Sequence, residues 1–217
     1  MKQERKIVID FGLPRTASKF RQYYFIQHPQ VKAIRFFLMG AMEQIITSKK
    51  PVFISDEGLY YHRKYRGKPS YAVSAMKTLF PQAKAMVVTR PYDSWVRSMY
   101  HQYVQGGSSG VLSFLEYQKQ FSPLFMDHKD FVKCLQKHFD EVLVLDFEDF
   151  KKDNTRFLTD ICKYLGVDYV YTDMSRSNSS FSPRAISFFR WINRNPKPVH
   201  MAFRYVCRMV RRYDETH

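Results

Sequence analysis

Four short apolar runs rich in β-branched residues most strongly limit how this chain can fold. They cover residues 6–11, 52–55, 83–89 and 141–146. The remaining stretches have apolar residues at helical spacing, at about 18–27, 38–48, 71–79, 91–104, 111–120, 129–139 and 155–165. Strands that alternate with helices form a mostly parallel sheet covered by helices on both faces. We therefore predict an α/β fold with a mostly parallel central sheet flanked by helices.

The first apolar run ends at Gly12, where small and hydroxyl residues lead into a helix. Backbone N–H groups at such a junction lack partners within the helix, and the helix dipole adds partial positive charge, so the loop suits a phosphate or a sulfate. In the register of a kinase phosphate loop, Lys19 comes one residue late and the hydroxyl that binds Mg²⁺ is missing. The loop therefore disfavours ordinary nucleotide triphosphate chemistry and predicts no need for a metal.

Residues 14–19 resemble the 5′-phosphosulfate loop of the sulfotransferases. The residues concerned are Pro14, Arg15, Thr16, Ala17, Ser18 and Lys19. Ala17 stands where this family usually has glycine, and Lys19 stands where it often has threonine. The resemblance implies a P-loop-like sulfotransferase fold, with this loop binding 3′-phosphoadenosine 5′-phosphosulfate (PAPS). It also implies that Arg15, helped by Lys19, stabilises the leaving phosphate.

Arg90 and Ser98 follow the third apolar run and are eight residues apart in the sequence. At that spacing a guanidinium and a hydroxyl can converge on one phosphate across a strand end and a helix. The pair resembles the 3′-phosphate motif of the sulfotransferases, although Pro91 comes one residue earlier than in many members. The alternative is that Arg90 caps the sheet and Ser98 is an ordinary helix residue.

Three further stretches extend the resemblance. Residues 28–37 resemble a segment of carbohydrate sulfotransferases, with Ala33 in place of its carboxylate. Residues 143–150 and 157–166 resemble the family's late strand, acidic turn and following helix. Residues 177–184 resemble a late loop that closes near the nucleotide, which implies a contact from Asn178. The resemblance implies transfer of a sulfuryl group to a hydroxyl or amine, with a carbohydrate or glycolipid as the expected acceptor.

Glu57 is the expected general base, because its carboxylate lies in a turn directly after the second apolar run. Arg15, Glu57 and Arg90 each follow a different predicted strand. Ligands bind beyond the carboxyl ends of parallel strands, so we expect these residues to share one site. A solvated turn acid is the alternative for Glu57, and His62 or His101 would then be the base.

The net charge of +15 over 217 residues predicts anionic partners. The length suits a single domain over 1–217. Its basic and aromatic part, 176–217, is expected to form helices that pack over the sheet or, alternatively, to contact an anionic membrane surface. The three cysteines have no C-x-x-C spacing, and no apolar segment suggests a signal peptide or membrane span, so we expect a cytoplasmic protein.

Two other functions compete with sulfuryl transfer. A basic nucleic-acid-binding protein would explain the charge, but the helix-turn-helix, zinc-finger and RNP signatures are missing from the sequence, so no nucleic acid is expected. A small-molecule kinase would explain the loop after Gly12, but the position of Lys19 argues against it.

Overall fold

The computed structural model describes residues 6–35, 39–60, 69–105, 112–121 and 124–173. The chain divides into two compact units, the first made of residues 1–92 and 123–174, the second of residues 93–122 and 175–217. The expectation of a single domain stays a prediction. The expected packing of 176–217 falls outside the described residues.

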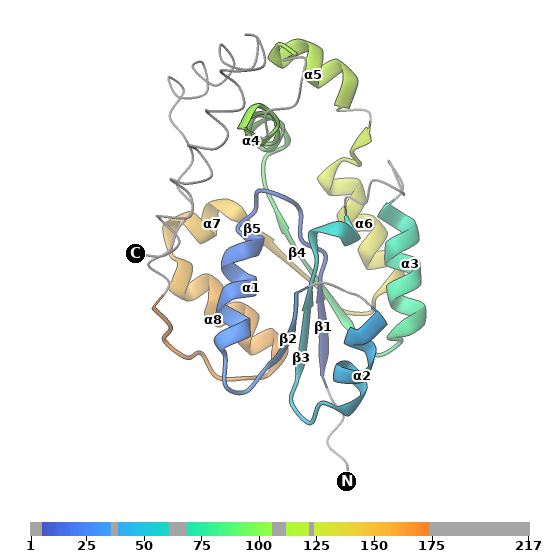
Figure 1. Ribbon diagram of the computed structural model, residues 1–217, viewed down its shortest axis with the longest axis vertical. Helices are drawn as coiled ribbons and strands as arrows, with labels where there is room; N and C mark the ends of the chain where they lie inside the picture. The colour runs from blue at the N-terminus through green and yellow to red at the C-terminus, as the bar shows by residue number, and fades with distance from the viewer. Residues whose placement is uncertain (1–5, 36–38, 61–68, 106–111, 122–123, 174–217) are drawn as a thin grey trace, which may run out of the picture. The chain divides into compact units, whose positions relative to one another are not determined.

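The first unit contains a five-stranded sheet with the strand order β2-β3-β1-β4-β5 (Figure 1). Every pair of neighbouring strands in it is parallel. The strands are β1 (Ile7–Asp10), β2 (Lys32–Ile34), β3 (Val52–Ser55), β4 (Lys84–Thr89) and β5 (Val142–Asp146). Ile9 of the central strand pairs with Ile54 on one side and with Ala85 on the other. The predicted parallel sheet is therefore confirmed, and its four predicted strands are β1, β3, β4 and β5.

The edge strand β2 is a strand that the sequence pattern does not predict. Residues 31–37 mix charged and apolar side chains and have no continuous apolar run. Lys32, Ala33 and Ile34 nevertheless pair with Val52, Phe53 and Ile54 of β3. A three-residue strand is formed here because β3 offers a free edge, which is a tertiary effect rather than a local preference.

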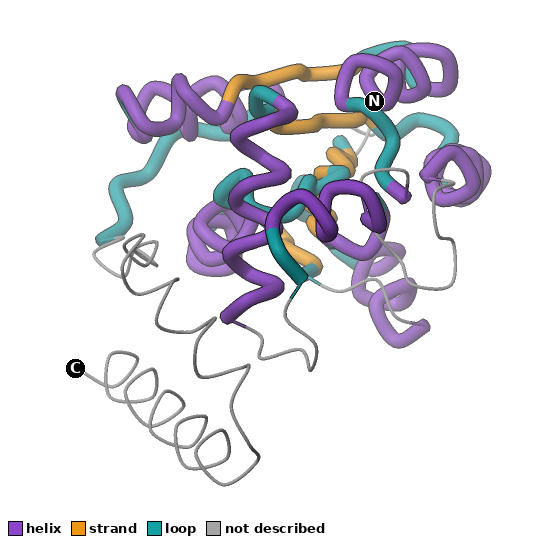
Figure 2. Tube along the Cα trace, turned by 90° about the horizontal axis from the view of Figure 1, so that it is seen from above, coloured by secondary structure: helices purple, strands orange, loops and turns teal. Residues whose placement is uncertain are grey.

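Helices cover both faces of the sheet; Figure 1 labels them, and Figure 2 shows the helices in purple and the strands in orange from above. The helices of this unit are α1 (Ser18–Gln27), α2 (Met39–Thr47), α3 (Pro69–Leu79), α6 (His128–His138), α7 (Phe147–Lys152) and α8 (Asn154–Leu165), with a 3₁₀ turn, η1, at Glu57–Leu59. On one face, side chains of α1 and α8 form a common core with β1, β3 and β4. On the other face, Phe11 contacts Phe131 of α6 at a ring-centroid distance of 6.2 Å, and α3 packs against α6.

The acidic turn expected after the fourth predicted strand is instead the helix α7. Asp146 begins this helix, because its carboxylate accepts a hydrogen bond from the backbone N–H of Glu148 at 2.8 Å. The helix α8 then ends at Gly166, whose φ of 77° is the left-handed conformation that glycine adopts without strain.

The described part of the second unit consists of α4 (Tyr92–Gln105), which begins at the unit border, and α5 (Phe114–Phe121). Aromatic rings join the two helices, with Tyr100 and Tyr117 at a centroid distance of 5.4 Å. The helix α5 begins later than predicted, because Ser113 and Glu116 form a reciprocal capping box. Within the described ranges, none of the helices has both the length and the apolar character needed to traverse a bilayer.

Candidate active site

The polar residues predicted to share a site follow strands that end at one edge of the sheet. Asp10 at the end of β1 lies beside Ser55 at the end of β3 and beside Met86 of β4. The loop of residues 11–17 leaves this edge after β1, Glu57 follows β3, and Arg90 follows β4. All three belong to the first unit, so their mutual contacts can be described directly.

The loop before α1 has a strained backbone. Arg15 and Ala17 adopt left-handed φ angles of 65° and 60°. Each such conformation costs a residue other than glycine roughly 1–2 kcal/mol. Ala17 is also the N-terminal cap of α1, and none of the described side chains supplies a capping hydrogen bond there. The strain therefore falls at the point where the family resemblance has glycine, and the first-turn amides of α1 remain suited to an anion.

A buried polar cluster lies beneath this loop and was missed by the sequence analysis. Arg21 of α1 is fully buried and forms an ion pair with the equally buried Asp10, with an N–O distance of 3.0 Å. It also donates from Nη1 to the carbonyl oxygen of Thr16 at 2.5 Å. The hydroxyl of Ser55 donates to the Asp10 carboxylate at 2.8 Å. The sequence does show a charged residue in each of two apolar segments, Asp10 and Arg21. It does not show that these two side chains contact each other.

Glu57 lies beside the start of α1. The hydroxyl of Ser18 donates a hydrogen bond to Glu57 Oε1, and a Cβ atom added to Gly12 would lie 3.8 Å from Glu57 Cγ. The 3₁₀ turn that carries Glu57 is itself capped, because Asp56 accepts a hydrogen bond from the N–H of Gly58 at 2.7 Å. The structure thus brings a half-buried carboxylate to the loop before α1.

Arg90 joins the end of β4 to the same loop. Its Nη1 donates to the carbonyl oxygen of Arg15 at 3.3 Å, and its guanidinium lies 4.8 Å from the ring centroid of Phe147. Burial lowers the pKa of Arg90, the carboxylate of Glu148 raises it, and the charge of Arg15 lowers it further. Two guanidinium groups that repel each other are therefore present at one edge of the sheet, and a bound anion would relieve that repulsion.

His128 supports Arg90 from the other side and was also missed. Its Nδ1 lies 2.8 Å from the carbonyl oxygen of Arg90, and a carbonyl oxygen only accepts, so Nδ1 carries the hydrogen. The ring is buried and makes T-shaped contacts with the rings of Tyr60 and Tyr92. Burial lowers the pKa of His128, while the bond to Arg90 and the charge of Asp127 raise it by smaller amounts. His128 belongs to no sequence motif, so the sequence alone gives no reason to select it.

The structure says less about the other predicted site residues. Lys19 is exposed in the first turn of α1. Ser98 and His101 belong to α4 in the second unit, and the structure does not place them relative to Arg90. His62 and Asn178 lie outside the described residues. His28 has a structural role, since its Nε2 donates to the carbonyl oxygen of Asp168 at 2.9 Å.

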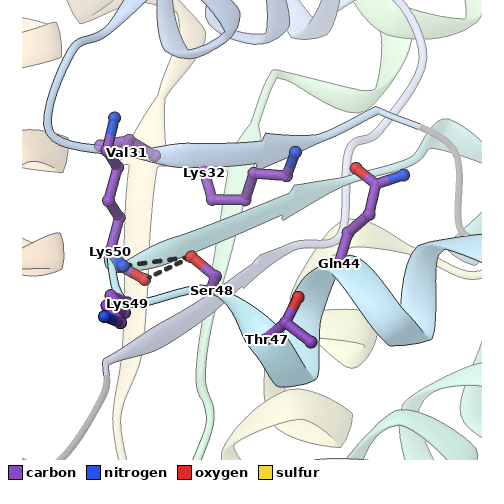
Figure 3. Close-up of a pocket in the computed structure, with 7 residues that line it drawn as sticks. All are labelled: Val31, Lys32, Gln44, Thr47, Ser48, Lys49 and Lys50. Atoms are coloured by element: carbon purple, nitrogen blue, oxygen red, sulfur yellow. Dashed lines mark hydrogen bonds between the residues drawn. The ribbon is translucent and has the colours of Figure 1, made fainter.

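A hollow of about 350 Å³ lies at the opposite edge of the sheet, at the amino ends of β2 and β3 (Figure 3). Its polar lining consists of Lys32, Gln44, Thr47, Ser48, Lys49 and Lys50. The two hydroxyls are already bonded, that of Thr47 to the carbonyl oxygen of Glu43 and that of Ser48 to the backbone of Lys50. Because the hollow lies at the amino ends of the strands, it is separate from the site at the carboxyl edge.

The described residues contain no group of three or more histidine, cysteine or acidic side chains arranged to hold a metal ion. Cys134 and Cys162 are free thiols, and Cys207 falls outside the described residues. Metal independence stays a prediction.

Comparison with known proteins shows a similarity to sulfotransferases. The sequence pattern of the sulfotransferase domain matches residues 67–165, which include Arg90 and Ser98. This segment of the chain is similar to the sulfotransferase domain. A sulfotransferase from Alicyclobacillus acidocaldarius has the same fold at 16% identity, with a TM-score of 0.62 over 88% of this chain and 93% of its own. These findings confirm the predicted sulfotransferase fold.

Two further solved structures share this sulfotransferase fold. Mouse SULT7A1, complexed with PAP, has 17% identity and a TM-score of 0.56, over 90% of this chain and 69% of its own. The sulfotransferase domain of the Synechococcus PCC 7002 olefin synthase has 14% identity and a TM-score of 0.52, over 94% of this chain and 98% of its own. No protein with a curated description matches the sequence significantly.

Proposed function

We propose that this protein is an enzyme that transfers the sulfuryl group of PAPS to a hydroxyl or amine of an acceptor. The observation that carries the proposal is the contact between Arg90 and the carbonyl oxygen of Arg15 at 3.3 Å. This contact joins the residue assigned to the 3′-phosphate to the loop assigned to the 5′-phosphosulfate. A nucleotide with charge at both ends suits such a pair of neighbouring cationic positions.

The nucleotide is proposed to bind with its 5′ end on residues 14–19 and its 3′-phosphate on Arg90 and Ser98, with Asn178 contributing from the late loop. Arg15 and the amides at the start of α1 support this binding mode, because they supply a cation and hydrogen-bond donors for a phosphosulfate. A fold relative, mouse SULT7A1, has been solved with PAP, which supports a nucleotide of this kind.

The reaction is proposed as an in-line displacement at sulfur. The acceptor oxygen or nitrogen forms a bond to sulfur while the bond from sulfur to the 5′-phosphate oxygen breaks, leaving 3′-phosphoadenosine 5′-phosphate (PAP). Glu57 takes the proton of the acceptor, since its carboxylate lies beside Ser18 at the loop. Arg15 and Lys19 stabilise the negative charge that develops on the leaving phosphate.

A carbohydrate or glycolipid is the proposed acceptor, on the basis of the resemblance over residues 28–37. The charge of +15 suits an acidic acceptor or an anionic membrane surface that carries a lipid-linked one. We place the protein in the cytoplasm or peripherally at its membrane, because the spacing of its cysteines suits a reducing compartment.

Thermal unfolding with and without nucleotide tests the proposal. A ligand that binds the folded state raises the melting temperature by mass action, and we expect PAP to do so at concentrations well above its Kd. ATP at the same concentration should raise it less, because ATP has no 3′-phosphate for Arg90. A larger shift with ATP would favour the kinase alternative, and a shift with RNA alone would favour the nucleic-acid alternative.

A further inference from the structure

The strained loop needs a second element to hold it in place. Arg15 and Ala17 are both left-handed and neither is glycine, and such conformations persist only where surrounding contacts enforce them. Three carbonyl oxygens of the loop are in fact bonded. Leu13 accepts from the hydroxyl of Thr16 at 2.6 Å, Arg15 accepts from Arg90, and Thr16 accepts from Arg21.

Arg21 is the donor with the most rigid support. Its Nε and Nη2 donate to the two oxygens of Asp10 at 3.1 and 3.2 Å, which leaves Nη1 to reach the carbonyl oxygen of Thr16. A bidentate arginine–carboxylate pair fixes the plane of the guanidinium. Ser55 fixes the carboxylate in turn, because its hydroxyl donates to Asp10 Oδ2. The position of the Thr16 carbonyl is therefore set by the ends of β1 and β3.

This arrangement determines where the loop amides point. In a planar trans peptide the C=O and N–H groups point in opposite directions. Arg21 holds the Thr16 carbonyl on the buried side, so the N–H of Ala17 in the same peptide unit points away from the core. The amides of Ser18 and Lys19 follow it at the start of α1. Successive amides that point outward at a helix start form an anion-binding concavity.

We propose that Arg21 is a positioning residue for the sulfuryl donor: with Asp10 and Ser55 it holds the strained loop so that its amides face the 5′-phosphosulfate. Glycine at position 17 of the family pattern allows the left-handed conformation without strain. In this chain the hydrogen bond from Arg21 holds the loop in that conformation instead. The inference rests on the proposed function.

The test measures PAP affinity of purified, folded variants by isothermal titration calorimetry. Arg21→Lys keeps the positive charge but loses the planar guanidinium that donates to Asp10 and Thr16 together. We expect it to weaken PAP binding about tenfold, the scale of one disturbed charge-assisted hydrogen bond. Tyr24→Phe is the matched control on the same helix, because it removes a buried hydroxyl that accepts from the N–H of Val170 at 3.1 Å, away from the loop. It should lower the melting temperature and leave the Kd for PAP unchanged.

A rescue experiment separates positioning from general destabilisation. Glycine adopts the left-handed conformation without strain, so Ala17→Gly should raise PAP affinity more in the Arg21→Lys background than in the unaltered protein. An equal gain in both backgrounds would show that the two residues act independently and would overturn the inference.

A milder variant covers the case in which Arg21→Lys does not fold. Ser55→Ala keeps both buried charges and removes the hydroxyl that donates to Asp10 and accepts from Gln22 Nε2, which still bonds to the Ser55 carbonyl oxygen. We expect it to weaken PAP binding about threefold, with rescue by Ala17→Gly. Unchanged affinity in folded Arg21→Lys or, failing that, in Ser55→Ala would overturn this inference alone. Absence of PAP binding by the unaltered protein would overturn the proposed function as well.

Discussion

Glu57 is the residue whose chemical role can be tested most directly. Its carboxylate is half-buried and accepts a hydrogen bond from Ser18 at the start of α1. Glutamine at this position keeps an oxygen that can accept from Ser18 but cannot take a proton. Glu57→Gln should therefore retain PAP affinity while turnover falls by roughly two to four orders of magnitude, the usual contribution of a general base.

Turnover of that variant is measured with PAPS and an acceptor that the unaltered protein sulfates. Glu43→Gln is the control, since it removes the same charge from an exposed position on α2. Turnover of Glu57→Gln at the rate of the unaltered protein would make Glu57 only a turn residue, and His62 or His101 would be the next base to test.

Arg90 is the second residue with a direct test. Loss of its guanidinium removes the proposed contact with the 3′-phosphate, so Arg90→Ala should weaken PAP binding by roughly 1.5–3 kcal/mol. Lys84→Ala removes one positive charge from the opposite end of the same strand and serves as the control. Equal PAP affinity for Arg90→Ala and the unaltered protein in calorimetry would refute this assignment.

At the scale of an element, the start of α6 should make folding stability depend on pH. His128, its first residue, is buried, and this burial lowers its pKa below the unfolded value of about 6.5. The unfolded chain then binds a proton that the folded protein does not, so the contribution of His128 is fully present above about pH 6.5 and is lost as the pH falls below that value. Tyr60, whose ring lies beside His128, stays a neutral phenol at these pH values, because burial raises its pKa.

Urea unfolding between pH 5.5 and 7.5 measures this dependence. In His128→Gln the loss of unfolding free energy toward low pH should be smaller than in the unaltered protein. His138→Gln, at the other end of α6, should keep the full loss. A pH dependence that survives unchanged in His128→Gln would contradict the prediction.

For the whole molecule, we expect activity without a metal ion. The arrangement of a lysine followed by a hydroxyl, which holds Mg²⁺ in phosphate-loop enzymes, does not occur in residues 14–19. We propose that Arg15 and the amides at the start of α1 meet the charge of the leaving phosphate instead. Turnover in excess chelator should equal turnover without it, and strict dependence on added Mg²⁺ would return the kinase alternative to first place.

Much of the site could be anticipated from local patterns. Residues 14–19, Glu57 and Arg90 each follow an apolar run, and the rule that parallel strands end at one edge brings them together. Arg21 and His128 escaped this reasoning for a physical reason. Each acts through a backbone carbonyl oxygen, that of Thr16 or of Arg90, and such a contact has no side-chain pattern in the sequence.

The α/β class and most element bounds follow from the sequence alone, because helix and strand periodicities and the stop signals at Gly12 and Gly166 act over a few residues. The strand β2, the ion pair between Asp10 and Arg21, and its link to Ser55 depend on the packed fold. These contacts join segments up to 45 residues apart. They form only when β1 lies beside β3 with α1 packed across them, because burial then makes pairing of each charge obligatory.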